Sequence, residues 1–246
     1  MRPFVFVNLA MSADGKISTR ERRQVKISGK NDFDRVDVIK AGADAIMVGV
    51  GTVLADNPSL TVKSPERKAK RKANGRDEHP LRIVIDSNAR TPLDADILHK
   101  GEGPRVIAVS EKAPQEKIEE LNQYADIFVG GEDKVDIAGL LEALYENGVK
   151  QVMVEGGGTL IAALFKENLV DEIYTCIGNI IIGGADAPTP ADGIGYIKEE
   201  DFPRLKLIDM DRIDDGVLLR WKVLGKCGAD CKEPSCDGCN CSGNCG

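Results

Sequence analysis

Val152–Thr159, which reads VMVEGGGT, runs without a break into the apolar segment Leu160–Phe165. The opening run of apolar residues predicts a buried strand, whereas Leu160, Ala163 and Leu164 share one face of a helix. Three glycines therefore stand where a strand turns into a helix. Backbone without side chains can approach a ligand closely, and the free N–H groups and dipole of a first helical turn favour a phosphate. The stretch predicts an α/β protein that holds a phosphorylated cofactor or substrate.

The rest of the chain continues this alternation of strand-like and helix-like segments. Strands are expected at 4–8, 45–48, 81–86, 106–109, 127–129, 172–177, 206–209 and 217–223, and helices at 32–41, 116–124 and 137–146. Alternation through residue 170 implies βαβ units and a largely parallel sheet flanked by helices. The last two strands imply an antiparallel hairpin at one edge. Glu155 then ends its strand at the carboxyl edge of the sheet, where ligands of α/β proteins bind.

The composition is that of a soluble globular protein with an appendage. Of 246 residues, 42% are hydrophobic and 30% are charged, and the net charge of −7 argues against general affinity for nucleic acid. No apolar run approaches the roughly 20 residues that a membrane span needs. The N-terminus enters its first strand without a signal-peptide pattern, which predicts a cytoplasmic protein. We expect one folded domain over residues 1–225 and a separate tail over 226–246.

Cysteine usage sets the tail apart. The first 226 residues contain only Cys176, which suits a reducing compartment, whereas six cysteines crowd into the last 20 residues. The tail has almost no apolar residues to bury, so it cannot fold by hydrophobic packing. Two interpretations stay open: a disordered tail with incidental thiols, and a site for a soft metal such as Zn²⁺ or Cu(I). The candidate ligands are Cys227, Cys231, Cys236, Cys239, Cys241 and Cys245.

Two further segments follow the first two expected strands. Asn8–Ile17 leaves its strand with polar side chains and turns at an Asp-Gly pair, and a tight turn explains that pair but not the polar residues around it. Gly49–Val62 brings small residues to the end of the next strand. Its purely structural interpretation is a helix capped by Thr52 and stopped at Asp56–Pro58. It lacks the third glycine of the dinucleotide fingerprint and the acidic residue that follows, which disfavours a Rossmann domain.

Ile85–Pro92 follows another buried strand, and Lys63–Arg76 carries seven basic residues. Ser87 and Arg90, just past the strand end, suit the extra phosphate of NADP, although an Asp-Ser turn with a surface arginine explains them equally well. The basic run is expected to be a solvated loop or a short exposed helix, with Lys63 as a candidate phosphate ligand.

Other chemistries lack the residues that they need. Only His79 and His99 are present, and both border loop-like regions where a surface position is expected. A histidine-rich metal site or a Ser-His-Asp triad therefore has little support. Nothing matches the motifs of a zinc deaminase.

Taken together and in this order, these segments resemble the reductases of riboflavin biosynthesis. The resemblance covers roughly residues 3–224 and is carried by Ser12–Lys16, Thr52–Pro58 and Val154–Gly157, each weak alone and specific as an ordered set. It is nearer to the stand-alone archaeal enzyme than to the C-terminal reductase domain of the bacterial bifunctional deaminase-reductase. The resemblance implies a dihydrofolate-reductase-like fold, a homodimer and NADPH as the cofactor, with NADH left open.

For the archaeal type, the resemblance implies reduction of 2,5-diamino-6-ribosylamino-4(3H)-pyrimidinone 5′-phosphate to its ribitylamino product, by hydride transfer to C1′ of the opened ribosylamine. Glu155 and Asp56 are the candidate catalytic carboxylates, which we expect to stabilise the iminium and to anchor ribose hydroxyls. The candidate cofactor residues are Thr52, Asp56, Ser87, Arg90, Gly156, Gly157, Gly158 and Thr159, with Gly130 and Gly131 as a looser match. The candidate substrate residues are Asn8, Ser12, Asp14, Leu60, Lys63 and Glu155.

Asn8 departs from the bacterial pattern, in which a lysine at this position contacts the reacting sugar. An amide can hydrogen-bond an opened ribose, but it cannot act as an ammonium acid. Two alternatives stay open at this point. One is a reductase of the same fold that acts on the deaminated pyrimidine or on a pterin-like substrate, and the other is a metal-binding protein that acts through its tail.

Overall fold

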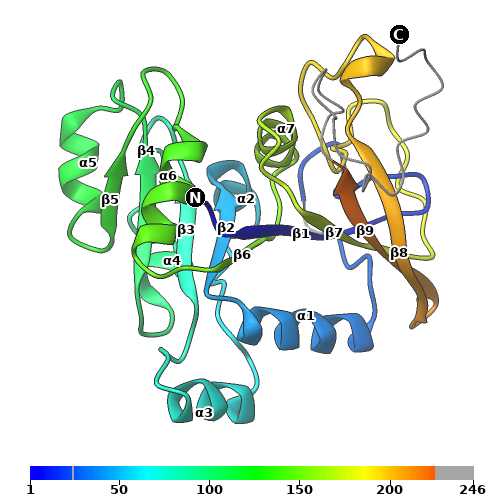
Figure 1. The fold of residues 1–246 in the computed structure, drawn as a ribbon, viewed down its shortest axis with the longest axis horizontal. Coiled ribbons are helices and arrows are strands. Elements are labelled where there is room, and N and C mark those ends of the chain that lie inside the picture. The colour runs from blue at the N-terminus through cyan, green and yellow to red at the C-terminus, as the bar shows by residue number, and fades with distance from the viewer. Residues whose placement is uncertain (24, 225–246) are drawn as a thin grey trace, which may run out of the picture.

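The computed structural model describes residues 1–23 and 25–224, and its centre is one nine-stranded sheet (Figure 1). The strands lie in the order β5-β4-β3-β2-β6-β1-β7-β9-β8. Their bounds are β1 Phe4–Met11, β2 Ala45–Gly49, β3 Leu81–Ile85, β4 Arg105–Val109, β5 Asp126–Val129, β6 Gln151–Val154, β7 Glu172–Ile177, β8 Arg204–Ile213 and β9 Gly216–Leu224. The helices of the described residues are α1 Lys30–Gly42, α2 Val50–Asp56, α3 Pro65–Ala73, α4 Asp96–His99, α5 Gln115–Leu121, α6 Ile137–Glu146, α7 Gly158–Lys166 and the short 3₁₀ helix η1 Glu199–Asp201.

The strands from β5 through β7 run parallel, and β9 and β8 continue the sheet antiparallel. This arrangement confirms the expected largely parallel sheet with an antiparallel edge hairpin. At its centre, Val154 of β6 pairs with Val7 of β1 on one side and with Met47 of β2 on the other. The segments that follow these three strands therefore emerge side by side at the carboxyl edge of the sheet.

Helices cover both faces of the sheet, and each face buries its own core. α6 and α7 pack on one face, whereas α1, α2, α4 and α5 pack on the other. Figure 1 shows α7 and α1 on opposite sides of the central strands. Along β1, Val5 and Val7 join the core under α7 while Phe6 joins the core over α1, because successive side chains of a strand point to opposite faces. Burial on both faces explains why the parallel strands are almost uniformly apolar.

The start of α2 differs from the sequence expectation. The helix begins at Val50, directly after β2, and its N-cap is Gly49. The interpretation of Thr52 as a helix cap is therefore wrong, since a glycine can supply the extended N-cap conformation three residues earlier. The expected stop is confirmed, because α2 ends at Asp56 and Asn57 adopts the left-handed conformation with φ of +43°.

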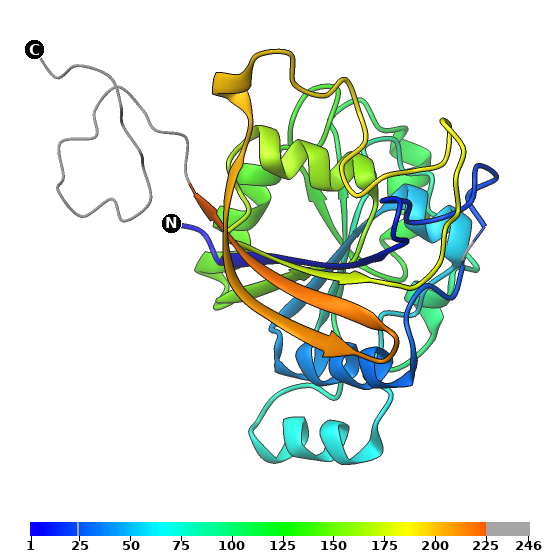
Figure 2. The ribbon, with the colours of Figure 1, turned by 90° about the vertical axis from the view of Figure 1, so that its right-hand side faces the viewer.

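The basic run forms helix α3, which Figure 2 shows set apart from the sheet beyond α1. The Ser64 hydroxyl caps it by accepting a hydrogen bond from Arg67 N at 3.3 Å. The expected short helix is thus confirmed. It is not exposed all round, because Arg71 is only 5% exposed and donates to the carbonyls of Ala41, Ala43 and Asp77.

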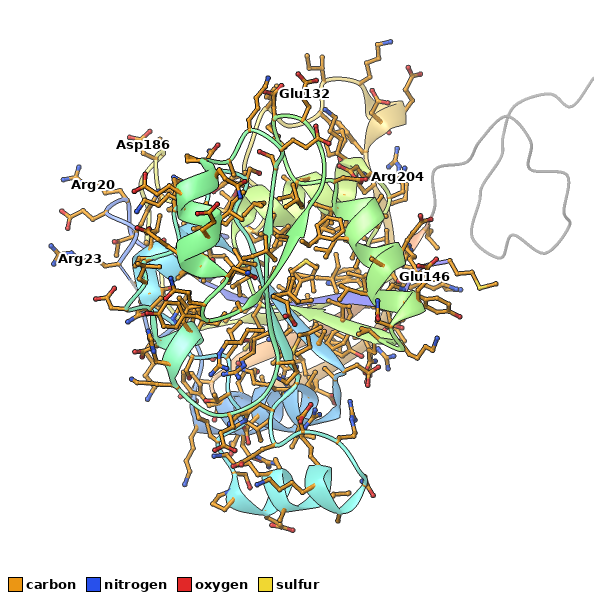
Figure 3. All side chains as sticks on the ribbon, turned by 90° about the vertical axis from the view of Figure 1, so that its left-hand side faces the viewer. Arg20, Arg23, Glu132, Glu146, Asp186 and Arg204 are labelled. Atoms are coloured by element: carbon orange, nitrogen blue, oxygen red, sulfur yellow. The ribbon has the colours of Figure 1, made fainter. Side chains whose placement is uncertain are left out.

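The loops after β1 and β7 lie together at the carboxyl edge. Ala13 N donates to Ile180 O at 2.9 Å, and Ile17 N donates to Pro188 O at 3.0 Å. Figure 3 shows charged residues of these loops on one side of the molecule, opposite Glu146 at the end of α6; the labelled ones are Arg20, Arg23 and Asp186. Among the described residues, no helix combines the length and the apolar character of a membrane span.

Candidate active site

Glu155 and Lys40 form an ion pair at the carboxyl edge of the sheet. Glu155 directly follows β6, and its N–H donates to Met47 O of β2 at 3.0 Å. Lys40, in the last turn of α1, places Nζ 2.9 Å from Glu155 Oε2. The two side chains are only 12% and 14% exposed, so water screens their attraction less than it would on an open surface. Sequence reasoning identified Glu155 but missed Lys40, which reads as an ordinary lysine at a helix end.

Asn8 emerges beside Glu155. Since Val7 pairs with Val154, the residues that follow them are neighbours across β1 and β6. Both side chains point to the face that α1 covers, because Val7 and Val154 point to the other face. Asn8 is 7% exposed, and its Oδ1 accepts a hydrogen bond from Arg35 Nη2 of α1 at 2.8 Å. Helix α1 therefore contributes a partner to both residues.

The expected strand-glycine-helix junction is confirmed, and it lies against α2. Gly157 has φ of +91°, a conformation that favours glycine. A Cβ on Gly157 would lie 3.4 Å from Thr52 Oγ1 and 3.5 Å from Gly49 N. The first hydrogen bond of α7 runs from Ile161 N to Gly157 O, so the N–H groups between them are free for an anion by helix geometry. The junction has the bare backbone and the donors that a phosphate needs.

Gly158 has a second reason to lack a side chain. A Cβ there would lie 2.6 Å from Thr189 O and 2.9 Å from Asp192 Oδ2. The segment after β7 thus closes over the start of α7, and Asp192 N donates to Gly158 O at 3.1 Å. Gly158 is buried, whereas Thr159 is exposed beside it. A cofactor contact at Gly158 would therefore run through its backbone N–H.

Helix α2 carries two candidate residues on one face. Thr52 and Asp56 are four residues apart, which places them one above the other on the helix. Thr52 is half-buried beside the glycine junction, and Asp56 is accessible at the helix end. Partial desolvation raises the pKa of the Asp56 carboxyl above its ordinary value. A carboxyl whose pKa is raised toward neutrality is better suited to exchange a proton.

The loop after α2 gathers donors around Lys63. Lys63 Nζ donates to Ser59 Oγ at 3.0 Å and to Thr61 Oγ1 at 2.9 Å. Burial, and after it the charge of Lys40, lowers the pKa of the Lys63 ammonium. Leu60 is 4% exposed with φ of +51°, so surrounding structure imposes the shape of this loop. The ammonium groups of Lys63 and Lys40 and the hydroxyls of Ser59 and Thr61 form a donor set that suits a phosphate.

Asp37 and His79 accept hydrogen bonds from the backbone of the loop that carries Lys63. Asp37 accepts from Lys63 N at 2.6 Å and from Ser64 N at 3.1 Å. His79 Nδ1 accepts from Val62 N at 3.2 Å. His79 is 2% exposed, so the expectation of a surface histidine is wrong. Its ring is buried because it takes the place of a backbone acceptor, and no local sequence pattern marks that role.

His79 is expected to make folding stability depend on pH. Burial, followed by the charge of Arg82, lowers the pKa of His79 to about 4 from an ordinary 6.5. Between those values the unfolded chain binds the proton and the folded chain does not, so the free energy of unfolding falls as pH drops from about 6.5 to 4. His79→Gln keeps an acceptor for Val62 N and removes the titration. The urea midpoint should therefore drop less between pH 7 and pH 4.5 in the variant than in the wild type. An equal drop in both proteins would contradict this prediction.

Ser87 and Arg90 lie in the turn after β3, on the same edge of the sheet. Ser87 Oγ accepts from Val135 N at 3.1 Å, which leaves its hydroxyl proton to donate to a ligand, and Arg90 is exposed. Gly131, after β5, has φ of +83°, and a Cβ there would lie 2.1 Å from Lys134 O. The turn by itself requires that glycine. The cofactor contacts of Gly130 and Gly131 stay predictions.

Ser12 and Asp14 are hydrogen-bonded to each other. Ser12 Oγ donates to Asp14 Oδ1 at 2.5 Å, and Asp14 accepts from Ile182 N and Gly183 N at 3.1 and 2.8 Å. The Ser12 hydroxyl, followed by Ile182 N, lowers the pKa of Asp14 to about 2. These bonds tie the turn after β1 to the segment after β7. A contact of either residue with substrate stays a prediction.

The structure therefore brings part of the predicted site into one place and leaves part of it in separate loops. Asn8, Glu155 and Lys63 lie around α1, and Thr52 lies against the glycine junction. Sequence reasoning missed Arg35, Asp37 and Lys40, all on α1. The six tail cysteines lie outside the described residues, within which no cluster of three or more potential metal ligands occurs.

Comparison with known proteins shows which family the chain belongs to. The model of the RibD C-terminal domain family matches residues 3–219. The chain belongs to this family. It is 49% identical over 216 residues to the 2,5-diamino-6-ribosylamino-4(3H)-pyrimidinone 5′-phosphate reductase of Archaeoglobus fulgidus, across 88% of this chain and 96% of that protein. It is 42% identical over 225 residues to the protein of the same name from Methanothermobacter thermautotrophicus, across 92% of this chain and 100% of that protein.

Solved structures of RibD proteins show the same fold. RibD of Acinetobacter baumannii matches with a TM-score of 0.72 at 24% identity, over 91% of this chain and 58% of that one. The expected dihydrofolate-reductase-like α/β class is confirmed for this RibD family member.

Proposed function

We propose that this chain is an NADPH-dependent oxidoreductase of riboflavin biosynthesis. It reduces C1′ of the ribosylamino group of 2,5-diamino-6-ribosylamino-4(3H)-pyrimidinone 5′-phosphate to the ribitylamino product. The observation that carries the proposal is the position of Glu155, which joins the glycine junction to the ammonium of Lys40. Relatives 49% and 42% identical are named for this substrate. A pterin-like substrate, or a protein that acts only through its tail, has no comparable support.

The residues at the carboxyl edge fit a nicotinamide dinucleotide. The bare backbone at Gly157 and the start of α7 suit its pyrophosphate, and the Ser87 hydroxyl has a proton to donate. Bound NADPH supplies the hydride. The chain supplies orientation and charge placement around the sugar.

The substrate residues divide by charge. Lys63 and Lys40 present cations suited to the 5′-phosphate. Glu155 presents a shielded carboxylate that stabilises the cationic C1′–N group formed when the ribose opens and that accepts a ribose hydroxyl proton in a hydrogen bond. Asp56, with its raised pKa, is the candidate to exchange a proton during ring opening.

The test is oxidation of NADPH by the purified full chain, with the diamino and the deaminated pyrimidine phosphates offered separately. We expect turnover of the diamino substrate and formation of the ribitylamino product, identified by mass. Turnover of only the deaminated compound would make that compound the substrate in place of the diamino one. Turnover of neither compound would overturn the proposed function.

Preference for NADPH over NADH is expected to depend on Ser87 and Arg90. Their hydroxyl and guanidinium suit the 2′-phosphate, so Ser87→Ala with Arg90→Gln should raise KM for NADPH about tenfold, a loss of roughly 1.4 kcal/mol. KM for NADH should stay within about twofold, because NADH lacks that phosphate. Steady-state kinetics with both cofactors measure this. A parallel rise for both would contradict the assignment.

We further propose a homodimer, supported by the outer strand of the sheet. Leu205, Leu207 and Met210 of β8 are 41%, 46% and 64% exposed, and an edge strand with exposed apolar side chains needs a cover. Sedimentation velocity of the wild type and of Leu207→Lys tests this, with a shift toward monomer expected for the variant. A monomeric wild type would contradict it.

A cytoplasmic location is proposed on the free, buried thiol of Cys176, which suits a reducing compartment.

The tail from residue 226 to residue 246 is proposed as a separate soft-metal site. Metal analysis of the full chain and of a truncation after Lys226 should find metal only in the full chain, with equal reductase activity in both. Near-zero metal in both proteins would contradict the metal site, and loss of activity on truncation would contradict the domain boundary.

A further inference from the structure

The amide of Asn8 is held by a guanidinium from α1. Arg35 Nη2 donates to Asn8 Oδ1 at 2.8 Å, and Arg35 Nε donates to Asp32 Oδ1 at 2.8 Å. The Arg35 side chain is 16% exposed and that of Asp32 is 3% exposed, so the chain Asp32–Arg35–Asn8 is largely enclosed. A hydrogen bond between enclosed groups, one of them charged, is stronger than its exposed counterpart.

This contact determines which end of the Asn8 amide is free. Arginine has only donors, so the group that faces Arg35 must be the amide oxygen, and the NH₂ group must face away. Asn8 Nδ2 makes no hydrogen bond within the described residues, and it is not among their enclosed unpartnered atoms, so solvent reaches it. The accessible part of this otherwise buried residue is therefore a donor.

The free donor lies where the substrate sugar is expected. Asn8 and Glu155 follow the paired residues Val7 and Val154, and both side chains point to the same face of the sheet. Glu155 presents acceptor oxygens there, held by Lys40. The donor of Asn8 and the acceptor of Glu155 are the complementary pair that polyhydroxylated sugars require.

We propose that Arg35 is a positioning residue for the reduction. It turns the Asn8 amide so that Nδ2 donates to a ribose oxygen of the substrate beside Glu155. The inference rests on the proposed function and deepens it. It also gives Asn8 a specific role, that of a neutral donor whose direction is set by a second residue.

Asn8→Asp is the decisive variant. Aspartate keeps an oxygen toward Arg35 and gains charge attraction, so the melting temperature should be unchanged or higher. It replaces the free NH₂ by an acceptor, and kcat/KM for the pyrimidine phosphate should fall about 100-fold. KM for NADPH should change less than about twofold. A purely structural role of Asn8 would leave kcat/KM intact in this variant.

Arg35→Met tests whether Arg35 acts through Asn8. We expect kcat/KM to fall, and we expect Asn8→Asp to cause little further loss in the Arg35→Met background, because effects of residues that act as a unit do not add. Arg2→Met is the matched control. It removes a partly buried arginine–carboxylate pair, with side chains 29% and 28% exposed and bonds of 2.6 and 2.8 Å to Asp171, and should leave kcat/KM unchanged.

The outcomes distinguish a failure of this inference from a failure of the proposed function. An inactive wild type overturns the proposed function and the inference with it. An active wild type whose Asn8→Asp variant keeps kcat/KM within about twofold overturns the inference alone, as do losses from the two variants that simply add. If Arg35→Met fails to fold, Asn8→Asp decides by itself.

Discussion

Glu155→Gln is expected to lower kcat by about 100-fold with little change in the fold. Glutamine keeps the shape of the side chain but cannot carry the negative charge that faces the C1′–N cation. It also leaves the Lys40 ammonium, 12% exposed, without its counter-charge, so the electrostatics of the pocket change beyond the loss of one group. Single-turnover and steady-state oxidation of NADPH with the diamino substrate measure the effect. Asp56→Asn is expected to lower turnover in the same direction.

Glu146→Gln is the matched control for this prediction. Glu146 is exposed at the end of α6, on the side of the molecule opposite the labelled carboxyl-edge loops (Figure 3). The same chemical change there should leave kcat unaltered. Unchanged turnover in both Glu155→Gln and Asp56→Asn would remove these carboxylates from the mechanism, whatever the control shows.

Gly157→Ala is expected to raise KM for NADPH about tenfold. The added Cβ lies 3.4 Å from Thr52 Oγ1, and it removes the bare backbone that lets a ligand approach a glycine closely. With φ of +91°, alanine at this position also costs about 1–2 kcal/mol of stability. Isothermal titration with NADPH and thermal unfolding separate the two effects.

Gly148→Ala is the control that isolates the stability cost of placing alanine at a positive φ. Gly148 has φ of +88°, nearly that of Gly157, and a Cβ there meets nothing within 4 Å. It follows α6, at the end of the sheet away from the glycine junction. Both variants should lose similar stability, and only Gly157→Ala should lose affinity for NADPH. Equal affinities would show that the junction does not bind the cofactor closely.

Much of the fold follows from local patterns. The run of apolar residues before Glu155 predicts β6, the glycines after it predict the junction, and α6 spans Ile137–Glu146 as its periodicity indicates. Strand ends were less predictable: β8 runs from Arg204 to Ile213, well beyond the expected 206–209, because its pairing with β9 continues past the apolar residues. Pairing with a neighbour sets the length of an edge strand, and its own sequence does not record that neighbour.

The sequence by itself determined the parallel sheet, the glycine junction and the candidacy of Glu155, because these depend on neighbours along the chain. Only the tertiary structure decided how the site is completed. Lys40, Arg35 and Asp37 are ordinary charged residues of one helix until α1 packs beneath β1 and β6, where they pair with Glu155, Asn8 and the backbone of Lys63. His79 becomes a buried acceptor for the same reason. A side chain acquires such a role from the groups that packing brings to it, and that contact leaves no periodic signal in the sequence.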